Sequence, residues 1–224
     1  MLKQYYKVTI FLLGFLFVFS TPVSAETGGL AIAGSSSTLG FGGELSTQVI
    51  DNVNARFGVN LFNLNLDGSL SDISYNLDVD LLGYSAMLDW HIFENAFHLT
   101  GGVIFNESQI GMSTTPTGSL TIGSTTYTAS EIGTISGNLS VEDIVPYIGI
   151  GFGNAFGKDK RWGFKTDFGI GFIGSPNIDL SANGTLTSDP AFLAELANEE
   201  RQIEEDISDF KIFPIFTFCI FYRF

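Results

Sequence analysis

The chain has 224 residues and a formal net charge of −14, from 24 acidic and 10 basic residues. An acidic balance of this size argues against nucleic acid and other polyanions as partners. The single cysteine, Cys219, excludes an intramolecular disulfide. The length suits one domain that can enclose a core.

The first 25 residues have the order of a secretory signal peptide. Lys3 and Lys7 precede an apolar stretch over residues 8–19, and small residues follow up to Ala25. A transmembrane anchor is the alternative, but this stretch is shorter than the roughly 20 residues that a helical span needs. We predict export, cleavage after Ala25, and one mature domain over residues 26–224.

The composition of the mature chain is unusual for an exported protein without helical spans. The sequence is 45% hydrophobic and contains 22 Phe, yet no later apolar run is long enough for a spanning helix. Lipid offers no partner to an unpaired backbone group, so a membrane protein without such helices needs a closed sheet. The composition therefore favours a transmembrane β-barrel.

Seven segments alternate between apolar and small or polar residues, which is the pattern of barrel strands. In chain order they are residues 39–49, 53–61, 82–92, 97–106, 146–153, 162–172 and 215–224, and the last is the clearest. The order of short and long connections requires one more strand before residue 39, and residues 29–34 are this weak first strand. A buried strand of a soluble sandwich is the alternative for such apolar runs.

The connections between these segments alternate in length. Short turns at residues 51–52, 94–95 and 157–160 alternate with longer connections at residues 67–72, 112–143 and 183–209. Outer-membrane barrels have short periplasmic turns and longer external loops. We therefore predict an all-β fold, an eight-stranded antiparallel up-and-down barrel with its long connections outside.

Two of the long connections contain predicted local structure. Gly123-Ser124 suits a type II′ turn between two short strands. Asp189 can cap a helix that starts at Pro190, with apolar residues at helical spacing and acidic residues on its other faces. We expect this short amphipathic helix to be a solvated cap over the barrel mouth, with a receptor-like or lid element as the alternative.

The inward faces of the predicted strands carry charges of both signs. The predicted lumen charge network consists of Glu44, Arg56, Asp89, Lys165, Asp167, Lys211 and Arg223. Buried charges need partners, so we expect ion pairs that fill a narrow lumen. A selectivity constriction is the alternative. Inward glycines would make room for bulky residues such as Met87, Phe213 and Phe221.

The two histidines, His91 and His98, flank the turn at residues 94–95 and are predicted to pair on the lumen face. A metal site with Asp89 is the alternative, but two ligands and a distant third do not form a closed zinc site. Gly169 to Gly174 fits a dinucleotide fingerprint, yet no helix follows it. We expect no catalytic residues, because no histidine lies near the external rim, and no cofactor or metal.

The chain ends in Tyr222-Arg223-Phe224 on an aromatic-rich strand. With the signal peptide, the strand alternation and the turn lengths, this end resembles the superfamily of small outer-membrane proteins typified by outer-membrane proteins A, X and W. The resemblance implies that barrel-assembly machinery recognises Tyr222 and Phe224. Trp90 and Trp162 fall on outward faces beside short turns, as in an aromatic girdle.

The resemblance leaves activity open, because the family includes adhesins, stabilising proteins, narrow pores and a few enzymes. We predict an outer-membrane protein with a structural or surface-interaction role, in contact with membrane lipid and lipopolysaccharide. Its acidic external connections would attract divalent cations weakly. A narrow porin-like conduit for small or apolar solutes is the second hypothesis, and a lipid-modifying enzyme is the third.

Overall fold

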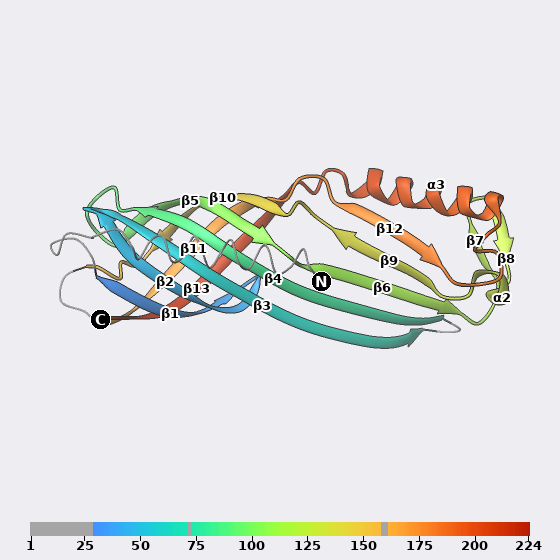
Figure 1. Ribbon diagram of the computed structural model, residues 1–224, viewed down its shortest axis with the longest axis horizontal. Helices are drawn as coiled ribbons and strands as arrows, with labels where there is room; N and C mark the ends of the chain where they lie inside the picture. Colours follow the sequence, from blue (N-terminus) through green and yellow to red (C-terminus); the bar gives the residue numbers. More distant parts are fainter. Residues whose placement is uncertain (1–28, 71–72, 158–160) are drawn as a thin grey trace.

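The computed structural model describes residues 29–70, 73–157 and 161–224, so the predicted signal peptide over residues 1–25 lies outside the described residues. Eight antiparallel strands close into a barrel (Figure 1). They are β1 (Leu30–Ser37), β2 (Gly40–Ile50), β3 (Val53–Leu70), β4 (Ile73–Trp90), β5 (Phe97–Asn106), β10 (Ile144–Phe152), β11 (Trp162–Phe172) and β13 (Ile212–Arg223). Pairing of β1 with β13 and of β4 with β5 closes the ring. The predicted eight-stranded barrel is confirmed.

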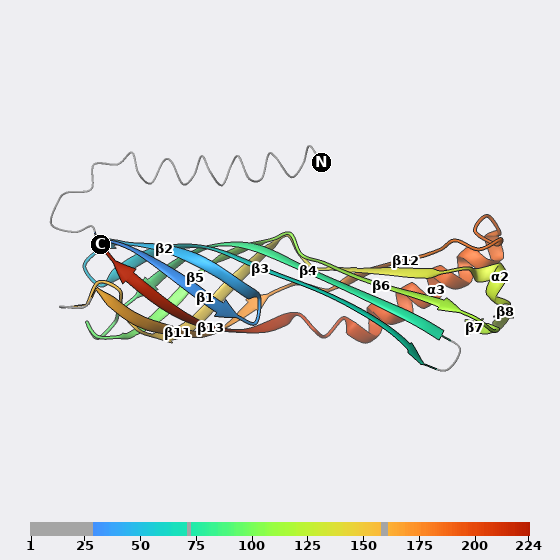
Figure 2. The same ribbon diagram turned by 90° about the horizontal axis from the view of Figure 1, so that it is seen from below.

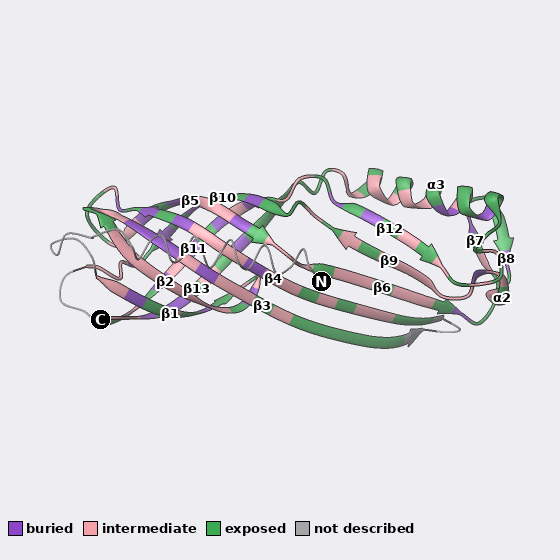
Figure 3. Cartoon of the chain, in the orientation of Figure 1, coloured by how far each residue is buried: buried purple, intermediate pink, exposed green. Residues whose placement is uncertain are grey.

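The outside of the barrel is apolar and exposed. Along β10 and β11, buried positions alternate with exposed aromatic and aliphatic residues (Figure 3). The exposed large hydrophobic residues of these two strands are Ile144, Ile148, Ile150, Phe152, Trp162, Phe164, Phe168 and Phe172. A closed sheet with a continuous apolar outer band is built for contact with lipid. No helix among the described residues is both long and apolar enough to cross a membrane.

The strands β3 and β4 continue far beyond the barrel and form a sheet with three further strands (Figure 2). These are β6 (Gln109–Pro116), β9 (Ile135–Ser140) and β12 (Asn177–Ala182), in the order β3, β4, β6, β9, β12. We call this sheet the extension. Much of the chain that was predicted to form loops between residues 67 and 143 is therefore strand.

The side chains of β3 and β4 exchange polarity where the barrel ends. Leu61 and Leu82 pair on the outer face, and the next outer pair along the strands is Asn63 and Asp80, joined by a 2.7 Å hydrogen bond. Beyond that point the outer face stays polar, and the inner face carries residues such as Leu64. This exchange places the edge of the lipid-facing band between the two pairs, because lipid and water demand opposite outer faces.

The predicted hairpin and helix are both present. The strands β7 (Leu120–Ile122) and β8 (Thr125–Tyr127) flank Gly123, whose φ of 59° suits the first central position of the expected turn. A short helix, α2 (Ala129–Ile132), follows. The second helix, α3 (Pro190–Ile207), is capped by Asp189, whose carboxylate accepts from two backbone N–H groups of the first turn.

The helix α3 lies along β12 and not over the barrel mouth, which corrects our expectation (Figure 1). Its buried residues Phe192 and Leu196 pack in one cluster with Ile122, Tyr127 and Ile132, and Leu180 of β12 adjoins the cluster. The inner face of the extension is apolar, so it offers α3 a surface to bury that the barrel rim does not.

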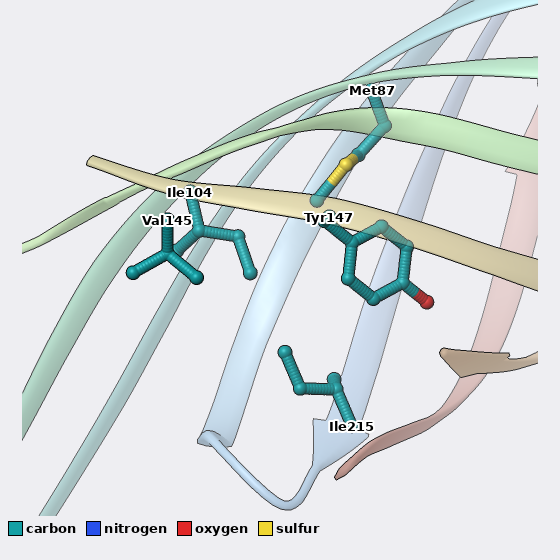
Figure 4. Packing of buried hydrophobic residues seen from close by; sticks show 5 residues of the cluster. All are labelled: Met87, Ile104, Val145, Tyr147 and Ile215. Atoms are coloured by element: carbon teal, nitrogen blue, oxygen red, sulfur yellow. The ribbon is translucent and has the colours of Figure 1, made fainter. Parts of the chain in front are cut away.

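A second apolar cluster fills the barrel interior on the side of the extension. It consists of Met87, Ile104, Val145, Tyr147 and Ile215, whose side chains come from four strands (Figure 4). The charged residues of the lumen therefore occupy a limited zone that begins at the Tyr147 hydroxyl and continues toward the short turns.

Candidate functional site

Arg56 on β3 is the centre of a buried charge cluster. Its guanidinium contacts Glu44 at 3.1 Å, Asp89 at 2.9 Å and Asp167 at 3.1 Å. The three carboxylates come from β2, β4 and β11, so the cluster spans the lumen. Strand alternation turns each of these side chains inward, and the planar guanidinium can bind several carboxylates at once.

Lys165 is the second cation of the cluster. Its Nζ lies 2.8 Å from Glu44 and 3.7 Å from Asp167. The hydroxyl of Thr100 donates to Asp89 at 2.8 Å. Three carboxylates thus face two cations, and each charged group has a partner of opposite sign. We call Glu44, Arg56, Asp89, Lys165 and Asp167 the lumen cluster.

The histidine pair lies beside this cluster. The rings of His91 and His98 are 5.0 Å apart, and Nε2 of His98 is 2.8 Å from Oδ1 of Asp167. His91 is held by Asn54, whose amide lies 3.0 Å from Nε2, and by the Asn95 carbonyl 2.9 Å from Nδ1. An amide donor at Nε2 and a carbonyl acceptor at Nδ1 are satisfied by the neutral ring protonated on Nδ1.

Three of these residues could in principle hold a metal ion. Ligand atoms of Asp89, His98 and Asp167 lie within 4.8 Å of one another. However, the Arg56 guanidinium hydrogen-bonds both carboxylates and so occupies the position of a bound cation. A divalent ion at that position would face a fixed positive charge, so this donor set suits a guanidinium better than a metal.

Glycines allow the lumen to be filled tightly. A Cβ on Gly151 would collide with His98 and Asp167, and one on Gly163 would collide with the Phe221 ring. One pocket, beside Glu44, Asp89 and Lys165, offers about 10 Å³ to the centre of a water molecule. That volume accommodates about one water. The described side chains therefore leave little free space in this pocket.

Two residues of the predicted network lie elsewhere. Lys211 is exposed and precedes β13 at the rim. Arg223, at the other end of β13, donates to the Gly157 carbonyl at 2.9 Å. Alternation along a strand fixes which face a residue lies on, but not its position along the barrel axis. The prediction therefore grouped both residues with charges that lie too far away along the axis to contact them. Phe213, expected in the lumen, is exposed as well.

The aromatic residues at the short-turn end lie close together. The Tyr222 ring is 4.9 Å from Trp162 and 5.2 Å from Phe224. Trp90 and Trp162 are both exposed on the outside of the barrel. The backbone N–H of Phe224 donates to the Leu30 carbonyl at 2.9 Å, which ties the chain end to β1.

Sequence reasoning missed two residues of the interior. Thr100 binds Asp89, and the Tyr147 hydroxyl lies so close to Gly149 and Gly169 that a Cβ on either glycine would collide with it. The signal for Tyr147 was present, because it is the largest residue on an inward face of β10 that otherwise carries Val145, Gly149 and Gly151. Thr100 carries no such signal.

No protein-family model and no curated protein matches this chain. Two solved structures from Acinetobacter baumannii are similar in fold. CarO is 20% identical with a TM-score of 0.57, and CarO2 is 22% identical with a TM-score of 0.59. In each case the alignment covers 88% of this chain and 98% of the other. The chain thus has the fold of a small outer-membrane β-barrel, and identities this low support the fold alone.

Proposed function

We propose that this outer-membrane barrel is a closed scaffold that presents the extension at the cell surface, with a structural or surface-interaction role. The observation that carries the proposal is the lumen cluster. It joins opposite walls of the barrel through paired, buried charges, and the pocket beside Glu44, Asp89 and Lys165 has room for about one water. Because packed side chains fill the barrel interior, the surface that remains accessible to partners is that of the extension.

An ion crossing the barrel would have to displace Arg56 or Lys165 from their carboxylates. Breaking a buried pair costs about 3–5 kcal/mol, because each released charge is left without a partner. We therefore expect little or no steady conductance when the full-length protein is reconstituted in planar bilayers, with a general porin as the positive control. A stable nanosiemens-scale pore would refute the closed scaffold.

The extension and α3 lie at the end of the molecule opposite the chain terminus at Phe224 (Figure 1). Assembly with the terminus on the periplasmic side puts them outside the cell, beside lipopolysaccharide. An epitope tag inserted at Asn198 of α3 should then bind antibody on intact cells. A tag at Asp159, which lies outside the described residues and in a connection predicted to be a short turn, should bind only after permeabilisation. The reverse labelling would contradict this topology.

Export and assembly are part of the same proposal. Cleavage after Ala25 would make Glu26 the first residue of the mature protein, which N-terminal sequencing checks. Recognition of Tyr222 and Phe224 by barrel-assembly machinery is supported by the packing of these rings on the outer surface. Deleting Phe224 should reduce the folded, heat-modifiable form in the outer membrane, and an unchanged amount would contradict a role in assembly.

Weakly bound Ca²⁺ or Mg²⁺ ions would bridge the acidic side chains of α3 and the anionic groups of lipopolysaccharide. Within the helix, Arg201 is the only cation, and Glu205 binds it at 2.6 Å. We expect low-affinity, unselective binding, and a single tight site in calorimetry would contradict it.

A narrow conduit for apolar solutes is the second candidate. The cluster of Met87, Ile104, Val145 and Ile215 is apolar and adjoins the extension, which favours entry of an apolar molecule from that side. Permeation of a small apolar dye into proteoliposomes at the rate of protein-free liposomes would remove this candidate.

A further inference from the structure

The inner face of the extension is apolar from one edge of the sheet to the other. Two rows of paired residues cross its strands in the order β3, β4, β6, β9, β12. The first row is Leu64, Val79, Ile110, Leu139 and Ile178, and the second is Leu66, Leu77, Met112, Gly137 and Leu180. All of these residues except Gly137 have apolar side chains. A sheet face of this composition needs a covering layer, as one side of a protein core does.

The helix α3 covers only one half of this face. It packs mainly against β12 and β7, and its buried residues Phe192 and Leu196 lie in the cluster that Leu180 adjoins. On the other half, Leu66 is 51% exposed and Met112 is 55% exposed. In the part of the chain that the structure describes, no helix packs against β3, β4 or β6 as α3 packs against β12. We call the inner residues of these three strands the open half: Leu64, Leu66, Leu77, Val79, Ile110 and Met112.

The missing layer has the dimensions of one helix. Three strands at about 4.8 Å spacing make a strip roughly 14 Å wide, and a helix with its side chains is about 10–12 Å across. The helix α3, which lies along β12, shows how such a helix sits on this face (Figure 1). Lipid does not cover the strip, because the sheet has already left the lipid-facing band at the pair of Asn63 and Asp80. An exposed apolar patch with polar surroundings marks a site of interaction with another molecule.

The charges around the open half select the partner. Residues 62–82, 106–143 and 173–210, which include the extension, its hairpin and α3, contain 17 Asp and Glu residues, one Arg, and no Lys or His. Surfaces of opposite charge attract one another, and surfaces of like charge repel. A second copy of this chain, with its net charge of −14, and anionic lipid are therefore both disfavoured. A basic partner is favoured.

We propose that the open half binds an amphipathic helix with a basic polar face, which lies beside α3 and along the strands. Its apolar stripe contacts Leu66 and Met112, and its basic side chains lie near the acidic side chains of α3. Burial of an apolar helix face on a matching surface supplies the affinity, and the charges supply the selectivity. The inference rests on the proposed surface-interaction role and deepens it, because it names the surface and the chemistry of the partner.

Peptide binding to the full-length protein in phosphatidylcholine nanodiscs tests the proposal, because this lipid carries no net charge that would attract the peptide. The probe is a peptide of Leu and Lys with the 18-residue length of α3 and Leu at helical spacing. The same pattern of Leu and Glu is the charge control. We expect the Lys peptide to bind, with a Kd that rises with salt, and the Glu peptide not to bind. Binding of neither peptide, or of both equally, would overturn the proposal.

A double variant removes apolar surface from the open half. Leu66→Asn with Met112→Asn should fold normally, because both side chains are already exposed, and heat-modifiable migration checks this. The matched control, Asn65→Ser with Ser113→Asn, changes the neighbouring positions on the outer face. We expect the inner-face variant to bind the Lys peptide at least about tenfold more weakly and the control to bind it like the wild type. Equal binding by the two variants would mean unspecific attraction to acidic residues and would refute the site.

A fluorescent label locates the bound peptide. Met112→Cys, labelled with an environment-sensitive dye, should emit at shorter wavelength when the Lys peptide binds, and Ser113→Cys on the outer face should not. Native Cys219 is fully buried and stays unlabelled. Equal spectral changes at both positions, or none at either, would contradict the proposed site. Wild-type dimers in detergent that the inner-face variant lacks would assign the open half to a second copy and overturn the proposal. Conductance reports separately on the closed lumen.

Discussion

The barrel and the extension use the same two strands with opposite sidedness. In the barrel half of β3, Arg56 faces inward among charges, while Leu61 and its outer neighbours face lipid. In the extension half, Asn63 and Asp67 face outward, and the inner face is apolar. The comparison shows that the medium beside each face, and not the propensity of the strand, sets the pattern of residues.

The two regions also satisfy their inner faces in different ways. The barrel encloses a polar interior and pairs its charges with one another, whereas the extension does not close and covers part of its apolar face with α3. The same kind of substitution should therefore lower the free energy of unfolding far more in one region than in the other.

The largest effect is expected from Arg56→Ala. Removing the guanidinium leaves three carboxylates with Lys165 alone, which should destabilise the barrel by about 3–5 kcal/mol. Arg201→Ala is the control in the extension, because its exposed pair with Glu205 contributes about 0.5 kcal/mol or less. Urea unfolding in detergent micelles measures both. Equal losses of unfolding free energy in the two variants would mean that the lumen cluster does not stabilise the barrel.

The next effect tests the outer faces. Phe168→Arg places a charge in the middle of the apolar band and should cost about 2–4 kcal/mol in a bilayer. Ser140→Arg on the polar outer face of the extension should change stability by about 0.5 kcal/mol or less. Unfolding titrations in lipid vesicles provide the comparison. A tolerated Phe168→Arg would contradict contact with lipid at this position.

A smaller effect separates two glycines of the barrel. Gly151→Ala would press a methyl group against His98 and Asp167 and should cost about 1–3 kcal/mol. Gly101→Ala on the outer face meets no atom within 4 Å and should be nearly neutral. The difference in the urea midpoint of the two variants reports on how tightly the lumen is filled.

The smallest effect is acid loosening of the hairpin of β7 and β8. The hydroxyls of Tyr127 and Thr125 donate to Glu195 and hold the pKa of its carboxyl below its ordinary value. The stabilisation is present at neutral pH and is lost as the pH falls through that lowered pKa, when the carboxylate becomes protonated. Protection factors of the hairpin amides, which correct for the intrinsic pH dependence of exchange, should therefore fall in acid, and Glu195→Gln should remove most of this dependence.

Much of the barrel was predictable because lipid enforces one regular pattern. Alternation located seven of the eight strands, and the order of short and long connections required the first strand and gave the antiparallel order. The extension was missed although Leu64, Leu66, Leu77 and Val79 continue the alternation, because their apolar residues occupy the face that is polar in the barrel. A search that expects the apolar residues of a strand to stay on one face takes such an exchange for the end of the strand.

The site was predictable in part. The rule that alternate residues of a strand face the lumen identified the five residues that meet in the lumen cluster, and it placed His91 beside His98. It could not separate them from Lys211 and Arg223, because the height of a residue depends on strand tilt and on the ends of β13, which alternation does not report. Contacts across the barrel, such as Arg56 with Asp167, depend on closure and have no local signal.

The position at which β3 exchanges polarity also indicates the thickness of the hydrocarbon layer that the barrel spans. Nine residues from Val53 to Leu61 keep the lipid-facing pattern. At about 3.3 Å per residue and a usual tilt of about 40°, they span roughly 23 Å along the membrane normal. The hydrocarbon layer matched to this barrel is therefore thin. In a thicker bilayer, the Asn63 and Asp80 pair would be drawn into the hydrocarbon region, so bilayer thickness should control how readily the protein inserts.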